Sequence, residues 1–154
     1  MLSRILFKSS LVAALGLAGV SSAAQETVEL RGDVKVVRTA EQNGSQVETL
    51  EDPEKVVPGD RLVFTTSYRN GSNEMVENFV GTNPLPDAVA LSRDEHFDVS
   101  VDGGESFCVL AKLEVSDEAG TRAAELSDVT HIRWILQSLE PDSAGTLTYS
   151  AVVR

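Results

Sequence analysis

The chain is poor in the residues that most often build catalytic and metal sites. Its 154 residues include one cysteine and two histidines. His96 and His131 lack a second histidine or cysteine at the short spacing used by zinc sites. No Gly-x-Ser-x-Gly segment marks a nucleophilic serine, and no glycine-rich turn leads from a strand into a helix, where it would bind phosphate. The sequence therefore predicts no catalytic residue, no cofactor and no enzyme activity. It places His96 in a solvated loop, and His131 on a strand, either at the surface or against the second sheet.

With a single cysteine, Cys108, the chain cannot form an internal disulfide. The fold must therefore depend on its hydrophobic core alone. Around this residue Phe107, Val109, Ala111 and Leu113 alternate toward one side of a predicted strand, and Cys108 faces the other. No histidine flanks it, so we expect a buried or half-buried, unreactive thiol.

Long hydrophobic runs are absent except for one near the start of the chain. The apolar stretch from Leu11 to Val20 follows Arg4 and Lys8, with no acidic residue among them. It is shorter than the roughly 20 residues that a bilayer requires. A basic start, a short apolar stretch and then small residues are typical of a secretory signal peptide.

Small residues at the end of this stretch predict where the leader is cut. Ser22 and Ala24 suit the minus-three and minus-one pockets of signal peptidase, which places the cut before Gln25, with Ser21 and Ala23 as the alternative pair. The predicted organisation is a signal peptide over residues 1–24 and one domain over residues 25–154. We expect a soluble product in the periplasm or outside the cell. Val20 stands where a bacterial lipoprotein needs cysteine, so no lipid anchor is expected.

Basic residues are also scarce. The chain has 24 acidic and 13 basic residues and a net charge of -11. Loss of Arg4 and Lys8 with the leader makes the mature chain more acidic, near -13. Such a field repels phosphate backbones and anionic membranes. Nucleic acid is therefore not an expected partner, whereas cations, basic surfaces and neutral glycans remain.

Apolar residues recur at every second position after Gln25, the period of a half-buried strand, and helical periodicity is nearly absent. Val28 and Leu30, then Val34 and Val36, keep one parity on either side of Arg31-Gly32-Asp33, which predicts a strand that bends or bulges at Gly32. This triplet resembles an integrin-binding motif, but we interpret it as a chance occurrence on a strand.

Turn residues separate the later strands. Asn43-Gly44 predicts a tight turn with a short strand returning through Val47 and Leu50. Pro58-Gly59-Asp60 opens another strand, and Asp102-Gly103-Gly104-Glu105 gives the strongest hairpin signal in the chain. Further strands are expected at Leu62–Tyr68, Met75–Thr82, Phe97–Val101, Phe107–Leu113, Ile132–Leu136 and Leu147–Val153.

About seven to nine short strands without intervening helices predict an all-β, immunoglobulin-like antiparallel β-sandwich. Trp134 and Phe64 are expected at the centre of its core, because large rings contribute most to burial in a chain with few aromatics.

An ordered series of turns and strands over residues 56–154 resembles the bacterial surface-repeat domain of unknown function. That family has Pro-Gly-Asp before a strand running into Asn-x-Gly, then Asp-Pro-Leu-Pro, and Leu-x-Pro-Gly before the last strand. The matching segments here are Pro58-Gly59-Asp60, the strand ending at Tyr68, Asn70-Gly71, Asn83-Pro84-Leu85-Pro86, the Trp134 strand with Leu139 and Pro141, and Thr146-Leu147-Thr148-Tyr149. The resemblance implies a single immunoglobulin-like module with a structural or adhesive role and no catalysis.

Acidic loops suggest the one cofactor worth testing. Asp102, Glu105, Asp117 and Glu118 fall in two neighbouring predicted loops, and oxygen ligands suit calcium, although the spacing is not that of an EF-hand. The sequence therefore predicts an exported, non-catalytic β-sandwich module with a structural or protein-interaction role at the bacterial cell envelope or outside the cell, where another envelope or surface protein is the expected partner. The alternative is a small periplasmic ligand-binding or calcium-binding protein. We expect a strand around residues 27–37 to cap its own sheet, with pairing to a neighbouring molecule, as in strand-exchanged assemblies, as the alternative.

Overall fold

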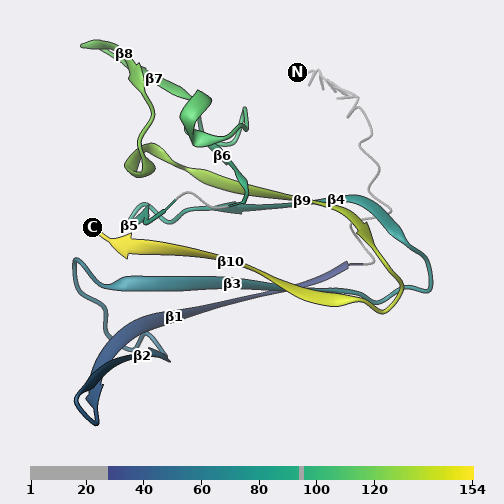
Figure 1. Ribbon diagram of the computed structural model, residues 1–154. Helices are drawn as coiled ribbons and strands as arrows, with labels where there is room; N and C mark the ends of the chain where they lie inside the picture. The colour runs from purple at the N-terminus through teal and green to yellow at the C-terminus, as the bar shows by residue number, and fades with distance from the viewer. Residues whose placement is uncertain (1–27, 94–95) are drawn as a thin grey trace, which may run out of the picture.

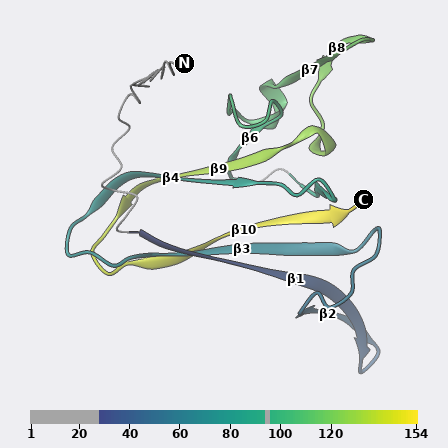
Figure 2. The same ribbon diagram turned by 180° about the vertical axis from the view of Figure 1, so that it is seen from behind.

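The structure, a computed structural model, describes residues 28–93 and 96–154. The predicted signal peptide and its cleavage site lie outside these residues. The described chain is all-β, and its two main sheets face each other as layers of an antiparallel sandwich (Figures 1 and 2). None of the described helices has the length and apolar character needed to cross a membrane.

The larger layer is a five-stranded antiparallel sheet with the order β2-β1-β3-β10-β5. Its strands are β1 (Val28–Gln42), β2 (Ser45–Glu51), β3 (Arg61–Asn70), β5 (Val89–Leu91) and β10 (Ala144–Val153). Strands β3 and β10 pair over most of their length and form its middle (Figure 1).

The smaller layer is a three-stranded sheet with the order β4-β9-β6, accompanied by a separate two-stranded hairpin. The sheet contains β4 (Val76–Pro84), β6 (Asp98–Ser100) and β9 (His131–Leu139), and the hairpin contains β7 (Glu114–Asp117) and β8 (Gly120–Ala123). Two short 3-10 helices, η2 (Leu110–Lys112) and η3 (Leu126–Asp128), flank the hairpin. The described residues thus form ten strands, slightly more than expected, because β5, β7 and β8 are short strands that were not predicted, whereas no strand forms over residues 107–113.

The turn chemistry at two sites acts as the sequence predicts. Asn43 (φ 53°) and Gly44 (φ 80°) both adopt the left-handed conformation that a two-residue hairpin turn needs, and they join β1 to β2. Before β3, Asp60 N donates to Val57 O (3.0 Å) across a turn in which Gly59 has φ 92°. The Arg38 guanidinium donates to the Asp60 carboxylate at 2.7 Å and lowers the pKa of Asp60.

The predicted bulge at Gly32 is wrong. The pairing of β1 with β3 passes without interruption from Arg31 opposite Ser67 through Gly32 opposite Thr66. A bulge would place two residues of one strand opposite one of the other. The glycine therefore sits in a regularly paired part of the strand.

The core lies between the two layers. Ile132, Val36 and Val99 are almost completely buried at its centre. Trp134 is buried as predicted, and its ring meets the Phe97 ring edge-on at 5.8 Å between centroids. These side chains come from both layers, so the main cluster joins the two sheets.

The prediction for Phe64 holds only in part, because its ring packs against the core yet remains half-exposed. It stacks on Tyr149, the deeper ring, at 4.8 Å between centroids. Burial raises the pKa of Tyr149 to about 12.

A second, smaller hydrophobic cluster lies at the other end of the sandwich. There β4 departs from the alternation of buried and exposed residues. Val76 and Phe79 on β4 are both buried although they are three residues apart, and they pack with Val28 and Leu139. Between them Asn78 adopts φ 51° and is not paired with the opposing strand. This left-handed residue changes the face that β4 presents to the core.

The strongest predicted hairpin is wrong in its second arm. Strand β6 is followed by a single bridge, Val99 to Cys108, and the chain then turns into η2. Leu110 and Leu113 contact the core at helical spacing, whereas Val109 is exposed. The predicted alternation from Phe107 to Leu113 is therefore replaced by a helical turn. Cys108 is a half-buried free thiol, as predicted.

Close packing at Gly145 gives a testable prediction. A Cβ atom at this position would lie 2.6 Å from Cζ of Tyr68, whose ring packs against the smaller cluster. Gly145→Val should force this ring to move and lower the free energy of unfolding by about 1–3 kcal/mol in urea denaturation. Gly32→Ala is the matched control, because a Cβ there meets nothing within 4 Å. Equal losses in the two variants would contradict this packing.

Candidate functional site

The carboxylate of Asp102, a predicted calcium ligand, accepts hydrogen bonds from residues of its own loop and from the end of β6. Its carboxylate accepts hydrogen bonds from the Ser100 hydroxyl (2.6 Å), from the Ser106 hydroxyl and backbone N–H, and from Glu105 N (3.1 Å). The Ser100 and Ser106 hydroxyls hold the pKa of Asp102 far below its usual range. The carboxylate therefore fixes the loop after β6.

The other three predicted ligands do not join Asp102. Glu105 is exposed in the same loop, and Asp117 and Glu118 lie in the separate turn between β7 and β8, where Asp117 accepts from Ala119 N at 2.8 Å. Among residues 28–93 and 96–154, no three or more His, Cys, Asp or Glu residues are arranged to hold a metal. The sequence placed these residues in adjacent loops, but it could not show that the carboxylates would bond within their own turns.

His96 lies in an exposed position as predicted, whereas His131 is less exposed than a surface position would be. His96 is exposed just before β6. His131 is half-buried at the start of β9, facing away from Ile132, and its Nδ1 is 3.1 Å from the Thr130 hydroxyl. Gly104, with φ 91°, lies against its ring, since a Cβ there would approach Cδ2 at 3.3 Å. The ring is therefore part of the packing of the Asp102 loop.

The bonds of Asp102 predict a pH-dependent contribution to stability. A carboxyl whose pKa is lower in the folded than in the unfolded state stabilises the fold above its unfolded pKa of about 3.9, and this contribution is lost as the pH falls below that value. Asp102→Asn should therefore unfold at lower urea concentration than the unmodified protein at pH 7. The difference should narrow at pH 3. Glu105→Gln, on an exposed side chain of the same loop, is the control. A difference that is unchanged at pH 3 would contradict this assignment.

A paired arginine attaches the β7–β8 hairpin to the body of the protein. The Arg122 guanidinium makes two hydrogen bonds to the Asp128 carboxylate, at 2.7 and 2.8 Å. This bidentate contact lowers the pKa of Asp128 to about 2. Asp128 also accepts from Glu125 N at 2.8 Å, which closes the first turn of η3. The hairpin therefore has a fixed attachment point.

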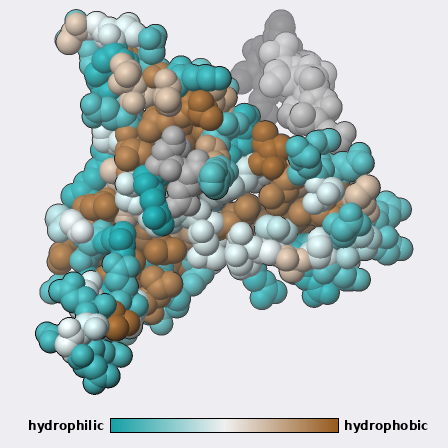
Figure 3. All heavy atoms as spheres, viewed as in Figure 1, coloured by the Kyte–Doolittle hydropathy of each residue, from teal (hydrophilic) through white to brown (hydrophobic). Residues whose placement is uncertain are grey.

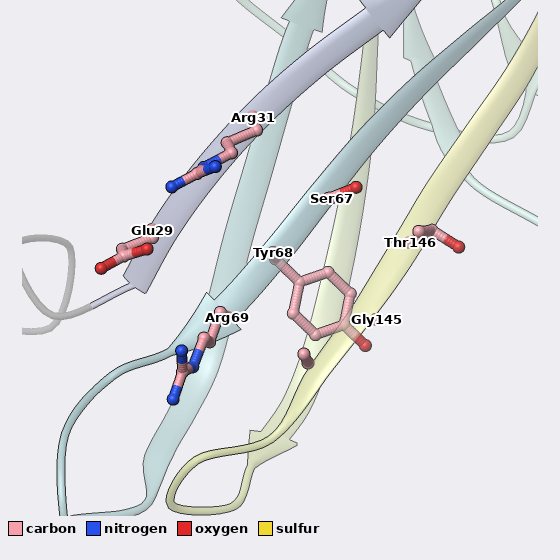
Figure 4. Close-up of a pocket in the computed structure, with 8 residues that line it drawn as sticks. Glu29, Arg31, Ser67, Tyr68, Arg69, Gly145 and Thr146 are labelled. Carbon is pink, nitrogen blue, oxygen red and sulfur yellow. The ribbon is translucent and has the colours of Figure 1, made fainter.

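A shallow hollow lies on the outer face of the larger sheet, near the ends of β1, β3 and β10 (Figure 4). Arg31 and Glu29 project from β1 along one side of it, and Tyr68 points toward Gly145 on the other (Figure 4). Arg69 reaches Asp142 at 3.4 Å. The complete lining is Glu29, Arg31, Ser67, Tyr68, Arg69, Ala144, Gly145 and Thr146. Its walls carry charges of both signs.

A second surface, on the outer side of the smaller sheet, is apolar. Val80 on β4 and Ile135 on β9 lie directly opposite each other and are 40% and 52% exposed, and Val109 is 44% exposed. Next to them the Arg133 guanidinium lies 4.3 Å from the ring centroid of Phe107. We call these five residues the β9 surface. In Figure 3, viewed from the side of the sandwich, apolar residues reach the surface in several places between polar regions.

The β9 surface borders a shallow depression whose lining combines apolar and charged groups. The lining residues are His96, Phe97, Asp98, Val109, Arg133 and Ile135. Arg133 Nη2 lies 3.3 Å from the Asp98 carboxylate, which holds the guanidinium over the ring. The sequence indicated only alternation in this strand, because Phe107 and Arg133 are far apart in the chain. Comparison with protein-family models, curated proteins and solved structures gives no match for this chain.

Proposed function

We propose that this chain is an exported, non-catalytic β-sandwich module that binds another protein at the bacterial cell envelope or outside the cell. The observation that carries this proposal is the β9 surface. Three aliphatic side chains are exposed together there around an arginine held over an aromatic ring.

The composition of the β9 surface is that of a protein-binding surface. Arginine and aromatic residues are enriched at the centres of interfaces, where they contribute most to affinity. Arg133 is already held in place by Phe107 and Asp98. Its side chain would therefore lose little conformational entropy when a partner binds. Covering Val80, Ile135 and Val109 would remove apolar area from water.

The negative net charge of the chain favours partners with basic surfaces. The chain has a net charge of -11, so basic protein surfaces are attracted to it over distances of about a Debye length, ~8–10 Å at moderate salt. A partner with an apolar centre and a basic rim would match both the β9 surface and the net negative charge of the chain.

The leader and the family resemblance support the location and the general role. The residues around Leu11–Val20 are typical of a secretory signal peptide. The resemblance to the bacterial surface-repeat domain implies a structural or adhesive function. The calcium-binding alternative is not adopted, because one of the four candidate ligands, Asp102, is bonded within its own loop and the described residues do not bring the others to it.

Site-specific crosslinking in living cells tests the proposal. A photo-crosslinking amino acid at Ile135 should give one dominant adduct with a protein in the exported fraction. The control position is Thr148, which is exposed on the outer face of the larger sheet and should give none. Ile135→Asp should abolish an adduct formed from the neighbouring position Val80. Retention of the uncut leader in the cytoplasm, or equal crosslinking from both faces, would overturn the proposal.

A further inference from the structure

We propose that two copies of this chain associate through the open edge of β1. The first half of this strand would pair antiparallel with the same segment of a second copy, and the two-fold axis would pass between the two Gly32 residues. This inference goes beyond the proposed function and uses a different surface, on the opposite layer of the sandwich.

The edge is open because β2 is shorter than β1. Strand β1 pairs with β3 from Val28 to Val36, but with β2 only from Val36 to Gln42. Pairing with β2 stops at Glu51, and Pro53, two residues later, has no N–H with which to continue it. Among the described residues, Val28–Lys35 therefore has no strand on its outer side.

The hydrogen bonding of the sheet shows which backbone groups face this edge. Asn70 N donates to Ser143 O at 2.9 Å, so the even-numbered residues of β3 bond toward β10. Backbone groups alternate in direction along an antiparallel strand, so the odd-numbered residues of β3 bond toward β1. They lie opposite odd-numbered residues of β1, as Ser67 does opposite Arg31.

The even-numbered residues of β1 consequently direct their N–H and C=O groups outward. In this segment they are Val28, Leu30, Gly32 and Val34. Among the described residues no strand lies on the side to which these groups point, whereas the odd-numbered neighbours bond toward β3. A row of free donors and acceptors is a template for another strand. In the proposed pair, Gly32 would bond to Gly32 and Leu30 to Val34 of the second copy.

The side chains of the same segment complement themselves in this register. Glu29, Arg31, Asp33 and Lys35 alternate in sign on the outer face. Antiparallel pairing about Gly32 places Glu29 opposite Lys35 of the second copy and Arg31 opposite its Asp33. Opposite charges in directly facing pairs stabilise a sheet, and like charges destabilise it.

The alternation also selects the register. A shift by two residues in either direction would place Arg31 opposite Arg31 or Asp33 opposite Asp33. Lys35 already contacts Asp52 within its own chain, but an ammonium has three donors and can also contact Glu29 of the second copy. The register centred on Gly32 therefore gives the most opposite-charge pairs along the open edge.

Two features of the isolated chain fit this pairing. Leu30 is 51% exposed although it lies on the core-facing side of β1, and Val34 of the second copy would cover part of it. Gly32 has no described atom within 4 Å of the position of a Cβ, so packing within the chain does not require glycine there. Glycine within a strand often marks a close approach by another backbone.

The other long edges lack this complementarity. The outer edge of β2 carries Glu48 and Glu51 and no basic residue, so two copies would repel. Strand β4 is interrupted by Asn78 in the left-handed conformation and ends at Pro84. A distorted strand with a proline is a poor template for continued pairing.

Charge-reversal substitutions at Arg31 and Asp33 test the proposed dimer directly. We expect sedimentation of residues 25–154, which retain every described residue, to show a reversible monomer–dimer equilibrium. Arg31→Asp and Asp33→Arg should each weaken the dimer about tenfold or more, because by symmetry each places two like-charge pairs opposite each other. The double variant Arg31→Asp/Asp33→Arg should restore it. An equimolar mixture of the two single variants should form a heterodimer.

The mixture also shows that both single variants are folded, since an unfolded chain could not restore pairing. A crosslink fixes the register: with Cys108→Ser as background, Gly32→Cys should oxidise to a covalent dimer, because directly opposed Cα atoms about 5.5 Å apart suit a disulfide. Glu29→Cys, at another exposed position of the same segment, should not, because the proposed register places it opposite Lys35. A protein that stays monomeric at millimolar concentration, or a dimer that the single reversals leave unchanged, would overturn the inference.

Discussion

Replacing Ile132 by alanine is expected to lower the free energy of unfolding by about 2–5 kcal/mol, the cost of removing a large aliphatic side chain from a core that cannot collapse around the space. Ile132 is 0% exposed on β9 and belongs to the cluster that joins the two layers. Urea denaturation followed by the fluorescence of the single tryptophan, Trp134, measures this loss from a reporter in the same cluster.

Ile135→Ala is the matched control for this loss. It makes the same chemical change three residues along the same strand, on the face turned away from the core. We expect a change within about 0.5 kcal/mol. Similar losses in both variants would show that β9 does not present Ile132 to the interior, and the two-layer packing would be wrong.

The second large effect is expected at Asn70, a completely buried polar residue at the end of β3. Its side-chain NH2 group donates to the carbonyl oxygens of Glu74 (2.8 Å), Leu139 (3.0 Å) and Glu140 (3.2 Å), and its Oδ1 accepts from the Ser72 N–H and hydroxyl. One amide thus connects β3, the loop that follows it and the turn between β9 and β10.

Asn70→Ala should lower the free energy of unfolding by about 2–4 kcal/mol, because buried carbonyl groups lose their donor. Asn70→Asp separates this effect from the loss of volume. It keeps the shape but removes the donors and directs a negative charge at the carbonyl oxygens, so it should be at least as destabilising at pH 7.

Asn73→Ala, in the exposed part of the same loop, is the control and should be near neutral. If Asn70→Asp were as stable as the unmodified protein in urea denaturation at pH 7, the amide would not hold these segments together as described.

Turns with local chemistry could be predicted from the sequence, because their conformation depends on the residues within them. Asn43-Gly44 and Pro58-Gly59-Asp60 are examples, and both lead into the strands expected after them. The all-β class followed from the period of two in strands such as β9, where Ile132 and Trp134 are buried on one face and Ile135 is exposed on the other.

Two predictions about strands were wrong, each for its own physical reason. The second arm after Asp102 did not form a strand because side-chain bonds within the loop and helical packing of Leu110 and Leu113 replaced backbone pairing. The alternation in β4 changed face because Asn78 adopts a conformation that its sequence context does not specify. In both places a local interaction outweighed a regular pattern.

The candidate surfaces depended on contacts between distant parts of the chain. Phe107 comes to lie against Arg133 only when β6 and β9 pair. The open edge of β1 required knowing where β2 stops, although the alternating charges from Glu29 to Lys35 were visible in the sequence. The motif read there as a chance triplet, Arg31-Gly32-Asp33, lies at the centre of this edge.

Amide hydrogen exchange along β1, followed by NMR at low and high protein concentration, tests most directly that this strand is bonded on one side and open on the other. At low concentration we expect the amides of Arg31, Asp33 and Lys35 to be protected by β3, and those of Leu30, Gly32 and Val34 to exchange rapidly. At high concentration the second set should gain protection while the first is unchanged. Uniform exchange along the segment at both concentrations would contradict both the sheet order and the proposed pairing.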